Sequence, residues 1–147
     1  MTNIKAISGL LAAIVVVVGV VALWAAQASA SSGPIVIPYA KTCAGGACTG
    51  SAGDDGTGTI KMQITSFRET GGGGAQLTLT EEITLDGVSF TAQMKGHVSP
   101  AGFIVLNGTV TEGSFAGAQV HQRSNLVGGD TTTTAWTGEL RIMPASA

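Results

Sequence analysis

From position 60 onward, apolar and polar residues alternate along the chain. Ile60, Met62 and Ile64 are each separated by a polar residue, and residues 77–85 and 88–94 repeat the pattern. A period of two is typical of a β-strand with one face buried and the other in water. The sequence therefore predicts several amphipathic strands in this part of the chain.

Tight turns are predicted between these strands. Asp86-Gly87 lies directly between the stretches 77–85 and 88–94, which is a strong signal for a β-hairpin with a type I′ turn. Asn107-Gly108 carries the same kind of signal and predicts a second hairpin. Ser99-Pro100-Ala101-Gly102 predicts a further turn between strands.

The remaining pattern completes an all-β fold. Further short apolar or alternating stretches lie at 103–106, 109–111, 114–122 and 136–142, and Ile35 to Ile37 could add a first strand. About seven strands with short turns and no amphipathic helix among them indicate a small antiparallel meander barrel or sandwich. We favour a barrel because Gly113 and Gly117 suit tight curvature.

Glu81 interrupts the apolar face of the stretch 77–85. We therefore expect a bulge or the end of a barrel at this position. Glu81 and Glu82 are neighbours on a strand, so their side chains point to opposite faces and cannot act together as a catalytic carboxylate pair.

A long apolar segment precedes the predicted strands. No charged residue lies between Lys5 and Lys41. Residues 6–26 would form a helix of about 31 Å, which matches the hydrocarbon thickness of a bilayer. We therefore divide the chain into a cytoplasmic stub (1–5), a transmembrane helix (6–30), a Gly/Ser-rich linker (31–58) and an exported antiparallel β-domain (59–147).

The flanking charge predicts the orientation of this segment. Lys5 and the amino terminus are its only positive neighbours, so the N-terminus should stay in the cytoplasm and the β-domain should be periplasmic or extracellular. Trp24 lies near the outer end, where an indole suits the headgroup region. The residues that we assign to the membrane anchor are Leu10, Ile14, Val18, Leu23 and Trp24.

Two other interpretations of the segment stay open. Ala28-Ser29-Ala30 matches a signal-peptidase site, but the apolar run is longer than the about 7–15 residues usual for a cleaved signal peptide, which favours a retained signal-anchor. Lys5-Ala6-Ile7-Ser8 and the apolar residues that follow resemble the start of archaeal type IV pilins. That resemblance implies proteolytic removal of the first residues and assembly into a filament.

The charge of the predicted exported part excludes some partners. From Ser31 onward there are six basic and nine acidic residues, and the basic residues are scattered in the sequence. Such a domain lacks the basic patch of a nucleic-acid-binding protein. It also lacks a polybasic cluster for anionic lipid. We expect no nucleic-acid partner, and the sequence leaves a small-molecule ligand undetermined.

Cys43 and Cys48 are the only cysteines. In an exported domain, two cysteines this close in a loop of small residues predict a disulfide. A zinc site would need further ligands at regular spacing, and His97 and His121 do not provide that spacing. We therefore expect neither a metal nor another cofactor.

No catalytic motif accompanies the candidate side chains. His97 lies near Ser99, but no nucleophile elbow surrounds that serine. Asp54-Asp55-Gly56 lacks the ligand spacing of a calcium loop and is better explained as a turn. We therefore expect a protein that is not an enzyme.

These observations favour one function over two others. The leading hypothesis is a single-pass, membrane-anchored accessory subunit that braces a larger membrane protein complex. Its helix would contact other subunits and the bilayer, and its β-domain would contact them outside. The alternatives are a secreted β-barrel that binds a ligand or carbohydrate after cleavage, and a subunit of an extracellular filament.

Overall fold

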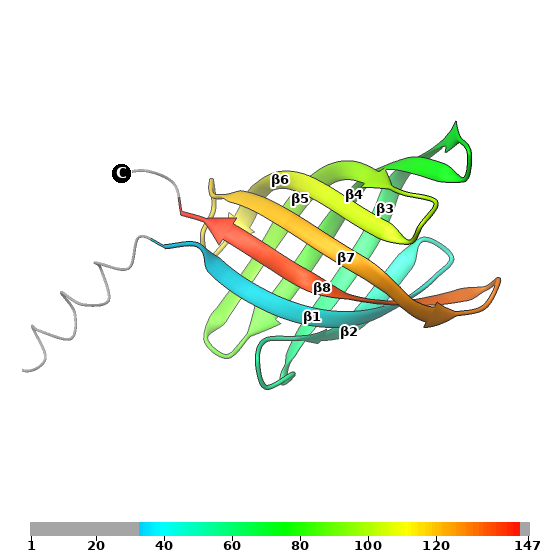
Figure 1. The fold of residues 1–147 in the computed structure, drawn as a ribbon. Helices are drawn as coiled ribbons and strands as arrows, with labels where there is room; N and C mark the ends of the chain where they lie inside the picture. Colours follow the sequence, from blue (N-terminus) through cyan, green and yellow to red (C-terminus); the bar gives the residue numbers. More distant parts are fainter. Residues whose placement is uncertain (1–32, 145–147) are drawn as a thin grey trace, which may run out of the picture. The chain divides into compact units, whose positions relative to one another are not determined.

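The computed structural model describes residues 33–144, and these form a closed eight-stranded barrel (Figure 1). Every strand pairs antiparallel with the strand that follows it in sequence, and β1 pairs with β8 to close the barrel. The meander barrel favoured by the sequence is therefore confirmed, with one strand more than expected. The predicted cytoplasmic stub (1–5) and transmembrane helix (6–30) lie outside the described residues.

The strands differ mainly in length, and β2 is the shortest. Their bounds are β1 Ile35–Ala44, β2 Ala47–Ala52, β3 Gly58–Gly71, β4 Gly74–Leu85, β5 Val88–Val98, β6 Phe103–Gly113, β7 Gln119–Gly129 and β8 Thr133–Met143.

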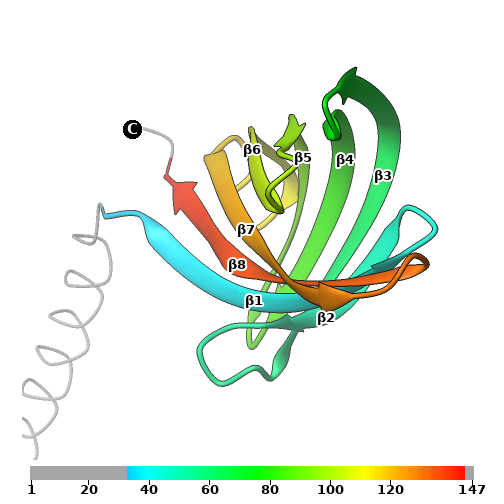
Figure 2. The same cartoon turned by 45° about the vertical axis from the view of Figure 1, so that its right-hand side comes forward.

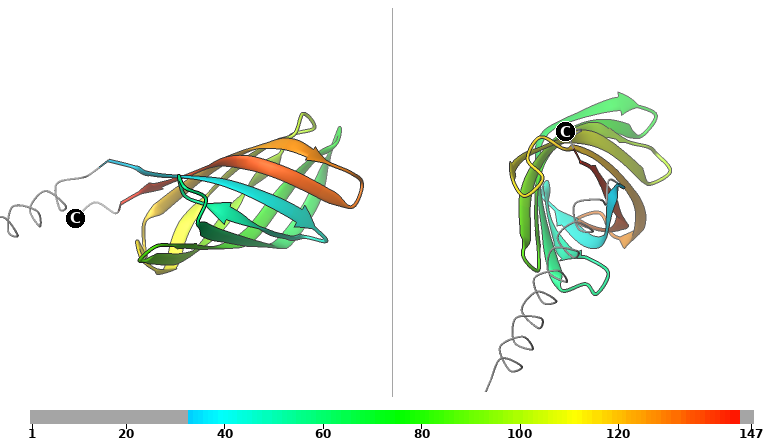
Figure 3. Two further views of the ribbon diagram at one scale, coloured as in Figure 1. Left: turned by 90° about the horizontal axis from the view of Figure 1, so that it is seen from below. Right: turned by 90° about the vertical axis from the view of Figure 1, so that its left-hand side faces the viewer.

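The seam between the first and last strands is continuous. β1 and β8 are paired from Ile35↔Ile142 to Ala44↔Thr133, and they lie side by side in Figure 1 and Figure 2. A view along the barrel shows the strands as a ring (Figure 3). Closure leaves neither the first nor the last strand as an open sheet edge along this seam.

The turns and chain ends divide between two ends of the barrel. The turns β1–β2, β3–β4, β5–β6 and β7–β8 lie at one end, which we call the hairpin end (Figure 1). The start of β1, the end of β8 and the other three turns lie at the opposite end, which we call the terminal end. Because successive strands run in opposite directions, an up-and-down barrel with an even number of strands has both chain ends at the same end of the barrel.

Inward-facing side chains fill the barrel. Alternate positions are buried along much of the wall, as expected for a small barrel whose interior is a packed core, whereas β3 and β7 are exposed on both faces where they approach the hairpin end. Among the largest fully buried side chains are Ile60, Leu79, Ile83, Met94, Leu106, Leu140 and Ile142. The alternating patterns at 60–64, 77–85 and 88–94 thus place their apolar residues inside, as predicted.

The Asp86-Gly87 hairpin is also confirmed. Leu85 and Val88 are paired on either side of it, and Gly87 has a φ of 71°, which a side chain disfavours. The predicted type I′ geometry is wrong, because that turn needs a positive φ at both central residues and Asp86 does not have one.

The linker prediction for residues 31–58 is wrong. Its described residues contribute β1 and β2, which are joined by a tight turn at Gly45-Gly46, and a longer turn follows between Ala52 and Gly58. The small residues misled the prediction. Gly50 takes an inward position, where a Cβ would lie 1.9 Å from the carbonyl oxygen of Ala40, so glycine here permits close strand approach.

Asn107-Gly108 does not form the predicted hairpin, because both residues lie within β6. Gly108 faces the barrel interior, and a Cβ there would lie 1.9 Å from the carbonyl oxygen of Gln93 on β5. The glycine is needed for the curvature of the wall and not for a turn.

Glu81 marks neither a bulge nor a barrel end. It lies within β4 in regular register with Met62 and Ala92. Within the pairings of β4, the register shift nearest to Glu81 lies in β3, between Ile64 and Ser66, and the shift at Thr91 and Ala92 concerns the pairing of β5 with β6. The reason for a carboxylate at an inward position is therefore chemical, and it is found in its neighbours.

Candidate functional site

The barrel interior contains one polar cluster. It consists of Tyr39 and Lys41 from β1, Glu81 from β4, and Gln122 and Ser124 from β7. All five side chains are buried, and Lys41 and Glu81 have no exposed side-chain surface. The cluster spans the lumen, because β4 lies three strands from β1 on one side and β7 two strands away on the other.

Gln122 is the centre of this cluster. Its amide nitrogen donates to Oε2 of Glu81 (2.9 Å), and its oxygen accepts from Nζ of Lys41 (2.8 Å) and from the Tyr39 hydroxyl (2.6 Å). The opposite amide orientation would bring the nitrogen against the donor Nζ of Lys41 and leave the lysine without this acceptor. Ser124 Oγ hydrogen bonds to the Tyr39 hydroxyl.

Lys41 and Glu81 form a long-range buried pair. Their Nζ and Oε2 atoms lie 4.0 Å apart, and Nζ also lies 3.2 Å from Sδ of Met62. Oε1 of Glu81 has no hydrogen-bond partner among the described residues. A buried carboxylate oxygen without a donor is costly when charged, so the pair is not a simple stabilising ion pair.

Burial shifts the protonation of both groups toward their neutral forms. Removal from water raises the pKa of Glu81, and the nearby Lys41 and Gln122 offset this only in part. Burial likewise lowers the pKa of Lys41, against the attraction of Glu81. Burial also raises the pKa of Tyr39 to about 12. The cluster therefore favours a neutral amine beside a carboxylic acid.

The cluster has no exposed surface to receive a substrate. The side chains around it belong to the packed core, so its groups are positioned to act on one another and not on a soluble molecule. The sequence analysis missed Lys41, Gln122, Tyr39 and Ser124. The available signal was the two-residue period of a strand. If residues 35–44 form a strand, Ile37, Tyr39 and Lys41 all face the same side, and that side is the interior.

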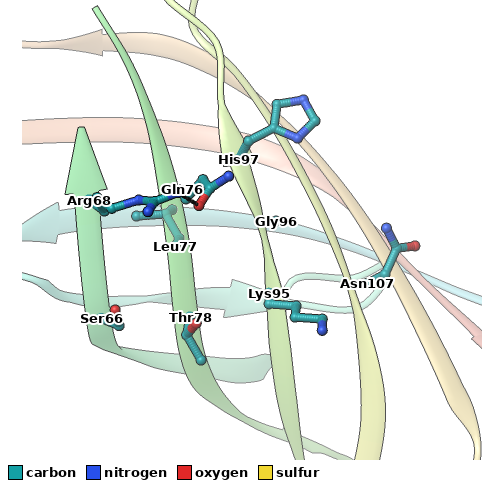
Figure 4. A pocket seen from close by; sticks show the side chains of 9 residues that line it. All are labelled: Ser66, Arg68, Gln76, Leu77, Thr78, Lys95, Gly96, His97 and Asn107. Carbon is teal, nitrogen blue, oxygen red and sulfur yellow. Dashed lines mark hydrogen bonds between the residues drawn. The ribbon is translucent and has the colours of Figure 1, made fainter. Parts of the chain in front are cut away.

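A polar hollow of about 670 Å³ lies on the outer wall, over β3 to β6 (Figure 4). Arg68 donates to Gln76 there (2.7 Å), and Lys95 and His97 extend from β5 toward solvent. Strand pairing brings together basic residues that are far apart in the sequence. Arg68 on β3 pairs with Gln76 on β4, and Gln76 pairs with His97 on β5, two residues from Lys95.

The histidines do not form a catalytic arrangement. His121 hydrogen bonds through Nδ1 to Oδ1 of Asn107 (2.6 Å), and Arg123 donates to its Nε2 (3.2 Å). His97 lies on β5, and no described hydrogen bond joins it to Ser99. Among residues 33–144, no group of three or more His, Cys, Asp or Glu could hold a metal ion.

Cys43 and Cys48 form the predicted disulfide. The bond joins β1 to β2 across their hairpin, where the two residues are directly paired. It encloses only the turn at the hairpin end, so it stabilises this turn locally. No free cysteine is present in the described part of the chain.

The acidic candidates are also explained by local structure. Oδ1 of Asp55 accepts hydrogen bonds from the backbone and hydroxyl of Thr57, which lower the pKa of Asp55. This is the turn expected around Asp54-Asp55-Gly56. Glu82 is exposed on the outer face of β4, opposite in direction to Glu81.

Exposed apolar side chains collect at the hairpin end. Phe67 near the end of β3, Phe103 at the start of β6, and Leu126 and Val127 near the end of β7 are exposed by 46–61%. We call these four residues the apolar rim. At the terminal end, the exposed large apolar residues among those described are Val36 and Met143.

The anchor residues assigned from the sequence, Leu10, Ile14, Val18, Leu23 and Trp24, lie outside the described residues. Among residues 33–144, we find no helix that is long and apolar enough to span a membrane. Comparison with protein families, with curated proteins and with solved structures gives no match to this chain.

Proposed function

We propose that this chain is a non-enzymatic accessory subunit of a larger membrane protein complex. Residues 6–30 anchor it in the bilayer, and the exported barrel braces the other subunits. The observation that carries the proposal is the apolar rim: of the six exposed large apolar residues among those described, Phe67, Phe103, Leu126 and Val127 lie at the hairpin end. Exposed apolar side chains grouped in this way are typical of surfaces that contact another protein.

The packed interior favours this function over that of a barrel that carries a ligand in its lumen. Ligand-carrying barrels keep a cavity inside, whereas here inward-facing side chains fill the lumen from Phe90 and Ile142 near the terminal end to Leu77 and Trp136 near the hairpin end. The ionisable groups inside the barrel, Lys41 and Glu81, are sealed in the core and cannot reach a soluble ligand.

The second candidate is a secreted binding protein released by cleavage after Ala30. The hollow around Arg68, Gln76, Lys95 and His97 favours it, because hydrogen-bond donors converge there over a volume that a small polar ligand could occupy. Aromatic side chains are missing from its lining, which makes it a poor platform for sugar rings.

N-terminal sequencing of the native protein separates the two candidates. The full chain is extracted from membranes of the organism that makes it, and its first residues are read by mass spectrometry of the N-terminal peptide. We expect a chain that still contains residues 6–30 and that sediments with membranes after a wash in high salt. A mature protein that begins at Ser31 would overturn the anchored function and favour the secreted one.

A further inference from the structure

The buried cluster brings together the parts of an amide-transfer reaction within one chain. Lys41 offers a nucleophilic nitrogen, Gln122 offers a carboxamide, and Glu81 offers an acid–base group at the amide nitrogen. We propose that Lys41 and Gln122 become joined by a spontaneous isopeptide bond, with Glu81 transferring the proton and ammonia leaving.

The positions of the three groups match their parts in the reaction. Nζ of Lys41 lies 2.8 Å from the carboxamide oxygen of Gln122, the atom bonded to the carbonyl carbon that Nζ must attack. Oε2 of Glu81 lies 2.9 Å from the nitrogen that must leave. Reacting groups held this close gain a large rate advantage over the same groups free in solution.

The hydroxyl of Tyr39 completes the arrangement. It lies 2.6 Å from the carboxamide oxygen, the atom on which negative charge develops when the carbonyl carbon becomes tetrahedral. Ser124 Oγ hydrogen bonds to the same hydroxyl, and when Ser124 is the donor the phenolic hydrogen is free to point to Gln122. Tyr39 therefore stabilises the developing oxyanion, and Ser124 is a positioning residue.

Burial supplies the required protonation states. An amine attacks only with its lone pair free, and the lowered pKa of Lys41 favours that form. A carboxylic acid can protonate a leaving nitrogen, and the raised pKa of Glu81 favours the acid. Oε1 of Glu81, which has no partner among the described residues, is available to carry the proton.

The reaction balances without any other reagent. The lone pair of Nζ forms a bond to Cδ of Gln122, and the bond from Cδ to Nε2 breaks. Nε2 leaves as ammonia after receiving one proton from Glu81, and Nζ gives one proton back to Glu81. The products are an amide between Lys41 and Gln122, free ammonia and an unchanged Glu81.

Gln122 is better placed than Glu81 to supply the carbonyl carbon that Lys41 attacks. Nζ of Lys41 lies 4.0 Å from the nearer oxygen of Glu81, against 2.8 Å from the oxygen of Gln122. A link to Glu81 would also consume the only acid–base group at the cluster. The proposed bond joins β1 to β7 across β8, so it fastens the seam where the barrel closes.

The mass of the purified full chain tests the proposal. The chain is extracted in mild detergent, reduced, denatured and weighed, and its N-terminus is read separately so that any processing is accounted for. We expect a mass about 17 Da below the sequence value, the mass of one ammonia lost when an amine displaces a carboxamide nitrogen. After trypsin, the peptide that contains Lys41 should remain joined to the peptide that contains Gln122.

Variants assign the roles. Gln122→Leu removes the acyl group and should restore the full mass, whereas the matched control Gln93→Leu, on the outer wall, should keep the loss. Glu81→Gln should also restore the full mass in chains that remain folded by circular dichroism. The mass of the wild-type chain and its linked tryptic peptides test the proposal even if a variant does not fold.

Three results would overturn the proposal. The first is a wild-type chain with its full sequence mass. The second is a loss of about 18 Da with Lys41 joined to Glu81, as expected when an amine displaces water from a carboxylic acid. The third is a Glu81→Gln chain that is linked as completely as the wild type, which would remove Glu81 from the reaction.

Discussion

Nζ of Lys41 and Oε2 of Glu81 lie 4.0 Å apart in the centre of the barrel, and neither side chain has exposed surface. Two ionisable groups in a small core are unusual, because each costs free energy to remove from water. Their presence among apolar residues means that each depends on the other and on Gln122.

The first prediction concerns the loss of one partner. Lys41→Met removes the amine beside Glu81 and its hydrogen bond to Gln122, which leaves buried polar groups without a partner, so the free energy of unfolding should fall by about 1–3 kcal/mol. Urea unfolding followed by circular dichroism measures this change. The matched control is Lys61→Met on the exposed face of β3, where we expect a change within about 0.5 kcal/mol.

The double variant Lys41→Met, Glu81→Leu should recover much of this loss, because the buried carboxyl group that lost its neighbour is also removed. If the single and double variants are equally unstable, the buried carboxyl group of Glu81 is not the cause.

Tyr39 provides the second prediction, since it is the only tyrosine in the chain. Burial raises its pKa from 10.0 to about 12. A raised pKa means that the folded state favours the neutral phenol, so this contribution to stability is fully present below pH 10 and is lost as the pH rises through 12.

Ultraviolet absorbance of the phenolate measures this titration directly. The native chain should titrate near pH 12, and the chain in denaturant near pH 10. A native midpoint near 10 would show that Tyr39 is exposed and that the buried cluster is absent. Tyr39→Phe identifies any background signal.

Much of the fold follows from the sequence because the relevant signals are local. The alternation from Ile60 to Met94 and the Asp86-Gly87 turn each involve residues close in sequence, and both are reproduced in β3, β4 and β5. The hairpin prediction at Asn107-Gly108 was wrong because the same dipeptide suits either a turn or a curved strand. Only the close approach of Gln93 from another strand decides between the two.

The buried cluster was beyond prediction for a related reason. Its members come from β1, β4 and β7, so they meet only when β1 pairs with β8 and the barrel closes. Glu81 was noticed as an interruption, but nothing near it in sequence identifies Lys41 or Gln122 as its neighbours. The strand that contains Lys41 was itself hidden by the small residues of the segment 31–58.

Gly108 and Gly128 provide the third prediction. A Cβ at Gly108 would clash with the carbonyl oxygen of Gln93, so Gly108→Ala should lower the free energy of unfolding by about 1–3 kcal/mol or prevent closure of the barrel. Nothing lies within 4 Å of a Cβ at Gly128 in β7, so Gly128→Ala should be close to neutral.

Thermal unfolding of both alanine variants measures the difference. Equal stability of the two would contradict the tight wall between β5 and β6.

The fourth prediction concerns the apolar rim at the hairpin end. If Phe67, Phe103 and Val127 contact other subunits, replacing all three with serine should weaken assembly without unfolding the barrel, because their side chains are already exposed. The matched control is Val36→Ser with Met143→Ser, which removes exposed apolar surface at the terminal end.

The most direct test of the proposed function is the native size of the full chain after extraction from its own membranes in mild detergent. We predict that the wild type and the Val36→Ser, Met143→Ser control migrate in a larger assembly with fixed stoichiometry, and that the rim variant migrates as the free chain. A wild-type chain that migrates alone in its detergent micelle would contradict the account.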